Sequence, residues 1–362
     1  MKILVTGSFS YQQYEPALAN ALKEINEEVK EFKWKDFFYC GTNPVLKFSS
    51  RFQNRFLYGP TINKLNKELI KVCEDFCPDL VFLYRGTHIQ EKTVMKMIKM
   101  GITVFSYNND DPFSGIPSDF YWRHYTGALK RCSHNFVYRV KNIHDMEVRG
   151  IKNTSILRSY YIESKNYHIP TIEKTIDVLF IGHFENDGRD ECLMHIISHG
   201  IEVRIFGDNG WRKSNYYNEL KAHLEIRPLD LNEYNLKINT AKIALVFLSK
   251  INTDTYTRRC FEIPATKTMM LSEYTPDLNS LFMEGEEAEY FRNKDELLNK
   301  VMYYLKNDEK RIAIGEKGYA RLMVDGHEIK NRAEYVMKVF HNIKGDILYE
   351  TSVHTRSIRE KV

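Results

Sequence analysis

A short polar segment between two apolar runs carries the side chains best suited to chemistry. Arg258, Arg259 and Glu262 stand close together there, after the run at 243–248 and before the run at 269–271. Such runs indicate buried parallel strands, and open α/β sheets bind ligands where a strand ends and the next helix begins. Two guanidinium groups at that place could bind a diphosphate, while the carboxylate accepts hydrogen bonds from sugar hydroxyls. A surface helix with an internal Arg–Glu pair is the alternative, and spacing alone does not separate the two.

A second set of polar residues follows the strands expected in the first half of the chain. Because parallel strands end at the same edge of a sheet, these residues form a candidate acceptor-binding site. A glycine after the first strand lets a ligand approach the backbone closely. The set consists of Gly7, Ser8, Arg85, His88, Asn108, Asn109, Asp110 and Asp111.

The adjacent carboxylates Asp110 and Asp111 permit more than one interpretation. They precede Pro112, so an Asx turn into a proline-started segment and a metal site are both open. Neighbouring side chains of a strand point to opposite sides, which favours one functional aspartate over a chelating pair. No metal site is therefore predicted. His88 is expected either to hydrogen-bond within its loop or to act as a base.

An aromatic stripe with basic neighbours lies between residues 45 and 71. Phe48, Phe52 and Phe56 recur every four residues, which is helical spacing, and cations stand among them. We favour a helix that packs its phenylalanine face on the N-terminal sheet. The alternative is a surface for a lipid-linked acceptor or an anionic membrane.

Apolar runs alternate with amphipathic segments along the whole chain. This alternation predicts parallel, doubly wound sheets with right-handed crossovers. Strands are expected at 2–6, 29–32, 80–84, 102–107, 135–138, 154–157, 177–181, 202–206, 243–248 and 269–271. Helices are expected at 16–28, 141–149, 190–199, 216–224, 231–241, 294–306, 309–324 and 329–343. The periodicity lapses at 160–174, where we place a linker between two domains.

Composition restricts the class of protein. The 362 residues are enough for two domains, and 43% hydrophobic with 28% charged residues are globular values. A net charge of +4 fits anionic ligands or a weak contact with a membrane surface, and it is far from a nucleic-acid footprint. Neither G-x-G-x-x-G nor G-x-x-x-x-G-K-[ST] occurs, which argues against nicotinamide dinucleotides and P-loop chemistry.

Cysteine usage and hydropathy point to the cytoplasm. The six cysteines are scattered and include no C-x-x-C pair, so reduced thiols are expected and a zinc site is not. The first residues turn polar too quickly for a signal peptide, and no apolar run approaches the length of a transmembrane span. A cytoplasmic protein is therefore expected.

The segment RCFEIPATKTMMLSEYTPDLNSLFMEGEEAEYFRNKDELLNKVMYYLKND, residues 259–308, resembles the C-terminal signature of GT-B glycosyltransferases. Within them it is most similar to the spore-maturation CgeB-like group, with an Arg-x-Phe-Glu start, a strand, a Pro–Asp–Leu loop and an acidic turn. The resemblance implies an α/β GT-B fold, in which two Rossmann-like doubly wound domains face a central cleft. Residues 1–160 would form the acceptor-binding domain and residues 175–325 the nucleotide-sugar-binding domain. Residues 326–362 would supply a helix that crosses back to the first domain, and a tail.

The same resemblance implies roles for residues in the second half. Glu262 resembles the second acid of the Glu-x7-Glu motif of retaining members, whereas the first position holds Asp254, which leaves the role of that position open. The usual glycine after Pro-Ala is also replaced, by Thr266. By position, a glycine loop after the first strand of this domain would contact donor phosphates, and the end of the next strand would border the nucleotide base. The residues so implied are Gly182, His183 and Arg189 for the loop and Gly207 and Asp208 for the strand end.

Together these features predict a glycosyltransferase of the hexosyltransferase type. It would move a sugar from a nucleotide-diphosphate sugar, with UDP favoured, to a glycan, lipid-linked or protein acceptor, and would use no metal or other cofactor. An inverting reaction would need a base to deprotonate the acceptor, and Asp110, Asp111 and His88 are the candidates in that order. Two alternatives remain open: a sugar-nucleotide epimerase of similar shape, and a degenerate binding protein in spore-coat or surface assembly.

Overall fold

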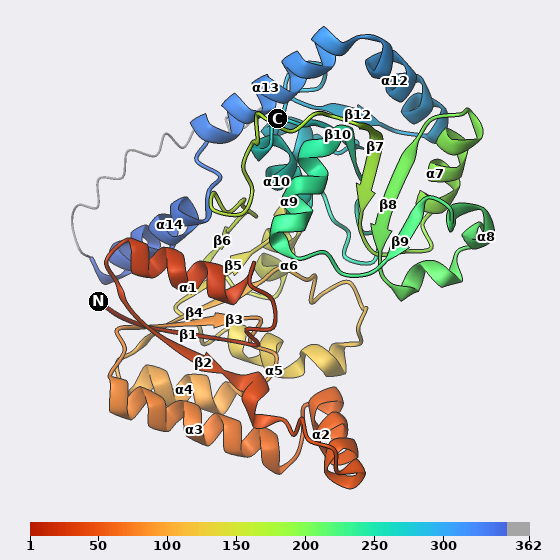
Figure 1. The fold of residues 1–362 in the computed structure, drawn as a ribbon. Helices are drawn as coiled ribbons and strands as arrows, with labels where there is room; N and C mark the ends of the chain where they lie inside the picture. Colours follow the sequence, from red (N-terminus) through yellow and green to blue (C-terminus); the bar gives the residue numbers. More distant parts are fainter. Residues whose placement is uncertain (346–362) are drawn as a thin grey trace. The chain divides into compact units, whose positions relative to one another are not determined.

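The alternation of apolar runs is realised as two α/β units in the computed structural model of the chain, which describes residues 1–345 (Figure 1). The first unit contains residues 1–158 and the helix that begins at Ile329, and the second contains residues 159–328. Each unit has a six-stranded parallel sheet. The prediction of two Rossmann-like, doubly wound domains is thereby confirmed. The tail expected after residue 345 lies outside the described residues.

The N-terminal sheet has the strand order β2-β1-β3-β4-β5-β6. Since β1, β3 and β4 are neighbours, the polar residues that follow them share one edge of the sheet. Its strands are β1 (Lys2–Gly7), β2 (Glu28–Lys33), β3 (Leu80–Tyr84), β4 (Thr103–Asn108), β5 (His134–Val137) and β6 (Thr154–Ile156).

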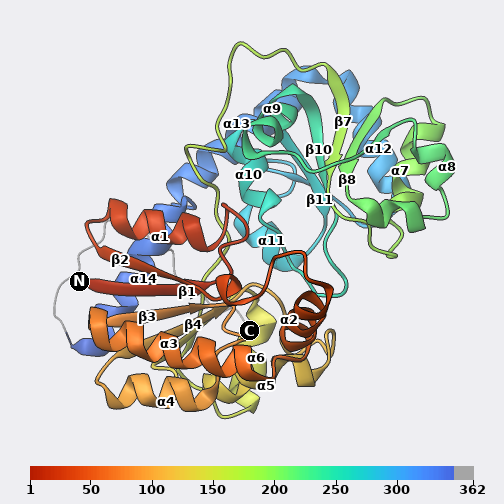
Figure 2. The ribbon, with the colours of Figure 1, turned by 60° about the horizontal axis from the view of Figure 1, so that its bottom comes forward.

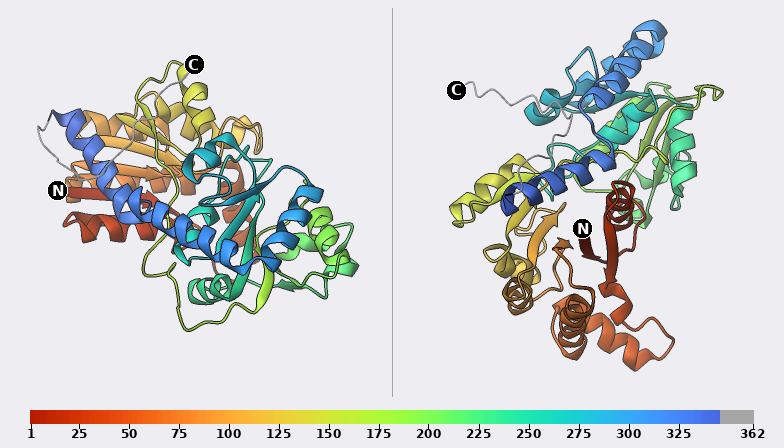
Figure 3. Two further views of the ribbon diagram at one scale, coloured as in Figure 1. Left: turned by 90° about the horizontal axis from the view of Figure 1, so that it is seen from above. Right: turned by 90° about the vertical axis from the view of Figure 1, so that its left-hand side faces the viewer.

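Helices cover both faces of this sheet (Figures 2 and 3). Leu4, Val81 and Val104 contact α3 and α4 on one face. The neighbouring Phe105 points to the other face, where its ring meets Phe340 of α14 at 6.3 Å between centroids, and α1 packs beside α14. The helices are α1 (Glu15–Glu24), α2 (Pro44–Phe56), α3 (Pro60–Phe76), α4 (Glu91–Lys99), α5 (Asp119–Leu129), α6 (Val140–Val148) and α14 (Ile329–Lys344), with a 3₁₀ turn η1 (Trp34–Phe37).

The C-terminal sheet has the order β12-β11-β10-β7-β8-β9. Val178, Ile243 and Met269 of its central strands pack against α7 and α12 in one hydrophobic core. The strands are β7 (Ile176–Ile181), β8 (Val203–Gly207), β9 (Leu224–Ile226), β10 (Ala241–Val246), β11 (Met269–Glu273) and β12 (Glu289–Phe291). The helical segments are α7 (Arg189–Ser198), η2 (Asn209–Lys213), α8 (Tyr217–Leu220), α9 (Leu231–Thr240), α10 (Arg259–Ala265), α11 (Pro276–Leu281), α12 (Lys294–Lys306) and α13 (Asp308–Val324).

The segment expected as a linker packs within the second unit. The backbone N–H of Tyr167 donates to Oδ1 of Asn235 at 3.1 Å, and that of Ile169 donates to Oδ1 of Asn239 at 2.8 Å. Both asparagines belong to α9, so this irregular segment is fastened along that helix by side-chain hydrogen bonds.

The aromatic stripe does not lie where we expected it. The segment forms two helices, α2 and α3, separated at Leu57, which adopts a left-handed conformation with φ of 48°. Phe48 and Phe52 are 71% and 48% exposed, and Phe56 is 37% exposed. The expectation that this face packs on the N-terminal sheet is therefore wrong. Throughout residues 1–345, every helix is too short or too polar to cross a bilayer.

Candidate functional site

Glu262 is the centre of a buried hydrogen-bonded network in the C-terminal unit. Its Oε1 forms an ion pair with Nε of Arg258 at 2.8 Å, and its Oε2 accepts the hydroxyl of Tyr234 at 2.7 Å. Burial and the nearby carboxylate raise the pKa of Tyr234 well above its usual value, so the hydroxyl stays protonated and donates. Carboxylate oxygens each have two lone pairs. Glu262 therefore has lone pairs left for a further hydrogen bond, although its side chain is only 3% exposed.

Arg259 is the first residue of α10, and its side chain lies next to the glycine that follows β7. Its Nη2 is 3.1 Å from the position that a Cβ would take on Gly182. Within the described part of the chain, no ion pair or hydrogen bond of its guanidinium is found. The loop after β7 and the start of α10 are thus brought together, and the Arg259 cation lies beside Gly182. Such an arrangement suits a phosphate.

The loop after β7 is held in shape by Arg189. Its guanidinium binds Asp187 through two hydrogen bonds, of 2.8 Å from Nε and 2.6 Å from Nη2, and donates from Nη1 to the carbonyl of His183 at 2.6 Å. The side chain is only 5% exposed. Its charge is neutralised inside the loop, so we assign Arg189 to loop geometry rather than to direct contact with a donor.

Trp211 joins this loop to the end of β8. The indole Nε1 donates to the carbonyl of Gly182 at 2.9 Å. A Cβ on Gly207 would lie 2.3 Å from the same indole, so this glycine makes room for the ring. His183 and Asp208 are exposed, with Nδ1 and Oδ2 3.1 Å apart. They are accessible to a ligand, whereas Gly207 serves packing.

Asp254 lies in the loop after β10. Its backbone N–H donates to the carbonyl of Ser249 at 2.9 Å, and its side chain is half-buried. Ser249 in turn donates from Oγ to Glu185 of the β7 loop at 3.0 Å. The loops after β7 and β10 are therefore linked, and the position that differs from the Glu-x7-Glu pattern stands near their junction.

In the N-terminal unit, Arg85 and Asp110 form an ion pair at the ends of β3 and β4. Burial is the largest single effect and disfavours the Arg85 cation, but the carboxylate of Asp110 and the neighbouring tyrosines together outweigh it, and the pKa of Arg85 is raised. The Asp110 side chain keeps 26% exposure. Arg85 also has a positive φ of 48°, which turns the chain sharply after β3. Asp110 is thus accessible, next to a fixed cation.

Asp111 is fully buried and stabilises the loop after β4. Its Oδ1 accepts the backbone N–H of Phe113 and Nδ2 of Asn142, both at 2.9 Å, and its Oδ2 pairs with Nζ of Lys141 at 3.1 Å. The bond to Phe113 is an Asx turn. This was one of the two interpretations left open by the sequence, and it assigns Asp111 to loop structure.

His88 is buried between aromatic rings. Its ring stacks on Trp34 with centroids 3.8 Å apart, and Nε2 lies 2.8 Å from Oδ1 of Asn54. Burial, and to a smaller degree the neighbouring His124, lowers the pKa of His88 to about 3. His88 is therefore neutral at physiological pH and acts as a hydrogen-bonding residue of the core.

Glu15 lies beside Gly7 and Ser8 and is a candidate that the sequence analysis did not include. Its Oε1 accepts the backbone N–H and the hydroxyl of Ser8, at 3.0 and 3.3 Å, and a Cβ on Gly7 would lie 2.3 Å from its side chain. Glu15 is 1% exposed, and Oε2 has no hydrogen-bond partner among the described residues. A glutamate immediately before Pro16, at the start of the first helix, was the available signal.

Two asparagines at the end of β4 also have unsatisfied atoms. Nδ2 of Asn108 and Oδ1 of Asn109 are buried and find no partner within residues 1–345. A buried polar group without a partner costs about 1–3 kcal/mol. These two atoms and Oε2 of Glu15 lie at the same edge of the sheet. Buried polar atoms without a protein partner are expected where a ligand or water supplies the hydrogen bond.

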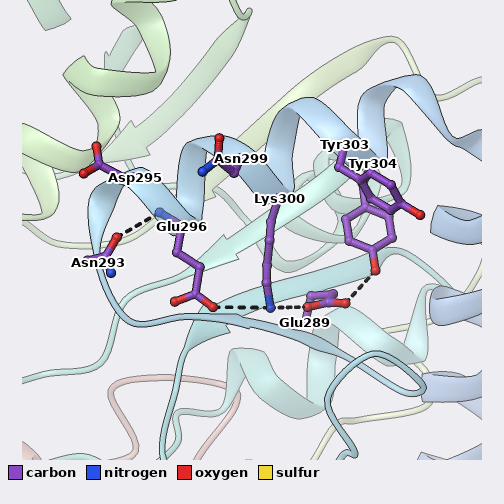
Figure 4. Close-up of a pocket in the computed structure, with 8 residues that line it drawn as sticks. All are labelled: Glu289, Asn293, Asp295, Glu296, Asn299, Lys300, Tyr303 and Tyr304. Atoms are coloured by element: carbon purple, nitrogen blue, oxygen red, sulfur yellow. Dashed lines mark hydrogen bonds and ion pairs between the residues drawn. The ribbon is translucent and has the colours of Figure 1, made fainter.

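A separate surface hollow lies along α12 (Figure 4). Lys300 binds Glu289 at 2.5 Å, and the hydroxyl of Tyr304 donates to the other oxygen of Glu289 at 2.5 Å. Glu296 also lies within 3.6 Å of Lys300. Lys300 is the one cation among the lining residues and is already paired with carboxylates, so the hollow has no counterpart to the Arg259 guanidinium beside Gly182. No cluster of three or more potential metal-ligating side chains occurs in the described residues.

Known proteins resemble this chain in sequence and in structure. A family model described as glycosyl transferase-like matches residues 189–338, which include Arg258, Arg259 and Glu262. The search of curated proteins found no match to the chain. Sucrose-phosphate synthase from Thermosynechococcus elongatus is similar in structure with a TM-score of 0.72 at 10% identity, over 95% of this chain and 99% of that one.

Two further solved structures have the same architecture. Anabaena HepE in complex with UDP and glucose gives a TM-score of 0.64 at 12% identity, covering 94% of this chain and 100% of that one. A glycosyltransferase from Rickettsia africae gives 0.66 at 11% identity, covering 95% and 98%. The fold of this chain is accordingly the GT-B fold.

Proposed function

We propose that this protein is a glycosyltransferase that uses a UDP-activated sugar. The observation that carries the proposal is the uncompensated guanidinium of Arg259 beside Gly182, next to the Glu262 network. This set lies within the region matched by the glycosyl transferase-like family model, apart from Gly182 itself. HepE, a neighbour with the same fold, was solved with UDP-glucose. The resemblance of residues 259–308 supports a place in the CgeB-like group.

Arg259 and the backbone of the β7 loop would bind the diphosphate of the donor. Negative charge develops on the diphosphate as the bond to the sugar breaks. A fixed cation therefore stabilises the transition state more than the ground state. Glu262, oriented by Arg258 and Tyr234, would accept hydrogen bonds from the ribose or the sugar. Because Arg259 supplies charge at that place, we propose that transfer proceeds without a metal ion.

The N-terminal unit would bind the acceptor, a glycan or a lipid-linked or protein-linked hydroxyl. An inverting transfer requires a base. Among Asp110, Asp111 and His88, we propose Asp110, since it alone is partly exposed while the other two are engaged in structural hydrogen bonds. All six cysteines are free thiols, which supports our proposal of a cytoplasmic location.

A thermal-shift panel of UDP, GDP, ADP, CMP and TDP tests the donor site. A ligand at a hundred times its dissociation constant stabilises a protein by about 2.7 kcal/mol, which is easily measured. We expect UDP to stabilise the wild type, and Arg259→Ala and Glu262→Ala to lose most of this shift. Arg204→Ala, which removes an exposed arginine of β8, is the matched control and should keep it. If no nucleotide stabilised the wild type, the proposal would be wrong and a binding module would replace it.

A sugar-nucleotide epimerase is the second candidate, because two neighbours of similar fold carry that name. A putative UDP-N-acetylglucosamine 2-epimerase from Listeria monocytogenes gives a TM-score of 0.59 at 11% identity, and the UDP-GlcNAc 2-epimerase of Neisseria meningitidis gives 0.55. NMR of UDP-sugars incubated with the protein separates the two activities. Release of UDP indicates transfer or hydrolysis, whereas interconversion of two UDP-sugars without release indicates epimerisation.

A further inference from the structure

Helix α2 presents polar side chains to the N-terminal unit. The hydroxyl of Ser50 is buried and accepts the backbone N–H of Tyr39 at 2.8 Å. Oδ1 of Asn54 lies 2.8 Å from Nε2 of His88, and Oε1 of Gln53 accepts a backbone N–H of α3 at 2.7 Å. The helix is therefore fastened by hydrogen bonds on its inner side. This is the reverse of the usual surface helix, which buries apolar residues.

The outer side of α2 is apolar. Val45 and Phe48 are 72% and 71% exposed, and Phe52 and Phe56 are also exposed. Residues four apart lie on one face of a helix, and the rings of Phe52 and Phe56 touch with centroids 4.5 Å apart. The side chains thus form one continuous surface. Contiguous exposed apolar surface of this kind marks an interaction site in soluble proteins.

The beginning of α5 extends this surface. Phe120 is exposed, and the guanidinium of Arg123 lies 3.8 Å from the centre of its ring. The same guanidinium donates to the backbone carbonyls of Phe56 and Leu57, at 2.5 and 2.8 Å. Arg123 therefore joins the end of α2 to the start of α5. We call Val45, Phe48, Phe52, Phe56 and Phe120 the α2 patch.

Positive charge accompanies the α2 patch. The segment 37–67 contains five basic residues and no acidic residue. Lys47, Arg51 and Arg55 of α2 are all exposed, and in the described part of the chain no carboxylate forms an ion pair with them. They recur every four residues, as the phenylalanines do, so they form a basic row along the aromatic one.

We propose that the α2 patch docks on the surface of a bilayer that contains anionic lipid. The helix would lie in the plane of the interface, with its phenylalanines at the boundary of headgroups and acyl chains and its basic row on lipid phosphates. Within α2 the aromatic row is accompanied by cations alone, which matches an anionic lipid surface in both respects; Asp119, beside Phe120 of α5, is an exposed carboxylate at the edge of the patch. The proposal is independent of the proposed enzymatic function, since it concerns binding without any nucleotide or acceptor.

Sedimentation of the full chain with phosphatidylcholine vesicles, with and without phosphatidylglycerol, tests the proposal. We expect binding to the anionic vesicles that weakens as salt rises, and little binding to the neutral ones. Phe48→Ser/Phe52→Ser and Arg51→Glu/Arg55→Glu should each weaken vesicle binding by roughly tenfold or more. All four side chains are exposed, so the thermal melting of both variants should match the wild type.

Ile312→Ser/Lys306→Glu is the matched control, because it removes an exposed apolar residue and an exposed cation from the C-terminal unit. It should sediment as the wild type does. Absence of binding to anionic vesicles, or equal losses in the control and the α2 variants, would overturn the proposal. Concentration-dependent dimers abolished by Phe48→Ser/Phe52→Ser, with no vesicle binding, would show instead that a second copy covers the patch.

Discussion

Nη2 of Arg259 lies 3.1 Å from the point where a side chain on Gly182 would begin. The two residues are 77 positions apart in sequence, yet the parallel pairing of β7 with β10 brings their segments to one edge of the sheet. Because residue 182 has no Cβ, one ligand group can contact both the backbone of Gly182 and the guanidinium of Arg259. A diphosphate is a ligand that uses both.

Gly182→Ala should therefore weaken UDP binding. The new methyl group would lie 2.7 Å from the ring of Phe180 as well as beside Arg259, so crowding should cost about 1–3 kcal/mol of stability. We expect the dissociation constant for UDP, measured by calorimetry, to rise about tenfold, a change of about 1.4 kcal/mol. In Gly127→Ala, the methyl group would meet only Glu91 at 3.7 Å. That control should bind UDP as the wild type does.

Glu262→Ala should reduce both stability and activity. The change leaves Arg258 and the hydroxyl of Tyr234 without their shared carboxylate, and unpaired buried groups cost about 1–3 kcal/mol. Denaturant unfolding measures the stability loss, and release of UDP from a UDP-sugar measures turnover. In the double variant Arg258→Ala/Glu262→Ala, stability should partly recover because the cation that lost the Glu262 carboxylate is removed as well, whereas turnover should not. Wild-type turnover in Glu262→Ala would contradict a role in the donor site.

The sheets were predictable because buried parallel strands are continuous apolar runs. The expected strand at 80–84 coincides with β3, and the helix expected at 294–306 coincides with α12. The strands β9 and β12 were not predicted; each has only three residues, too few for a periodic pattern. Length alone does not decide the outcome, because the three-residue β6 was expected at 154–157, whereas the eleven-residue α5 was not expected.

The site was only partly predictable, because its contacts join distant segments. Tyr234 and Glu262 are 28 residues apart and meet through a side-chain hydrogen bond that no local pattern indicates. The stripe of Phe48 and Phe52 was misplaced for a related reason. Its spacing predicts a helix with an apolar face, but Ser50 and Asn54 on the opposite side hold α2 to the protein, so that face is turned outward.

Stability should fall as the pH is lowered through the range that His88 controls. The unfolded imidazole binds a proton below about pH 6.5, whereas burial keeps the folded ring neutral until about pH 3. The unfolded state therefore binds more protons in this window. The contribution of His88 is fully present above pH 6.5 and is lost by about 1.4 kcal/mol for each pH unit below it.

Denaturant unfolding of the wild type and His88→Gln between pH 7 and 4 measures this contribution. Glutamine can keep the hydrogen bond to Asn54 but does not titrate. We expect the variant to be less stable at pH 7, because it loses the stacking on Trp34, and to show a shallower decline with acid. Parallel curves for the two proteins would contradict a buried neutral histidine.

Glu15→Gln should impair use of the acceptor while leaving donor binding intact. Glutamine retains the shape of the side chain and an oxygen that can accept the two hydrogen bonds from Ser8, so the melting temperature should change little. It replaces the unpartnered Oε2, an acceptor, by an NH₂ group that can only donate. If Oε2 accepts a hydrogen bond from the acceptor hydroxyl, kcat/KM for the acceptor should fall by at least about tenfold, since roughly 1.5–3 kcal/mol is typical of a hydrogen bond to a charged group. The affinity for UDP, which binds the other unit in our proposal, should stay at the wild-type value. An unchanged kcat/KM would assign Glu15 to the packing of Gly7 and Ser8 alone.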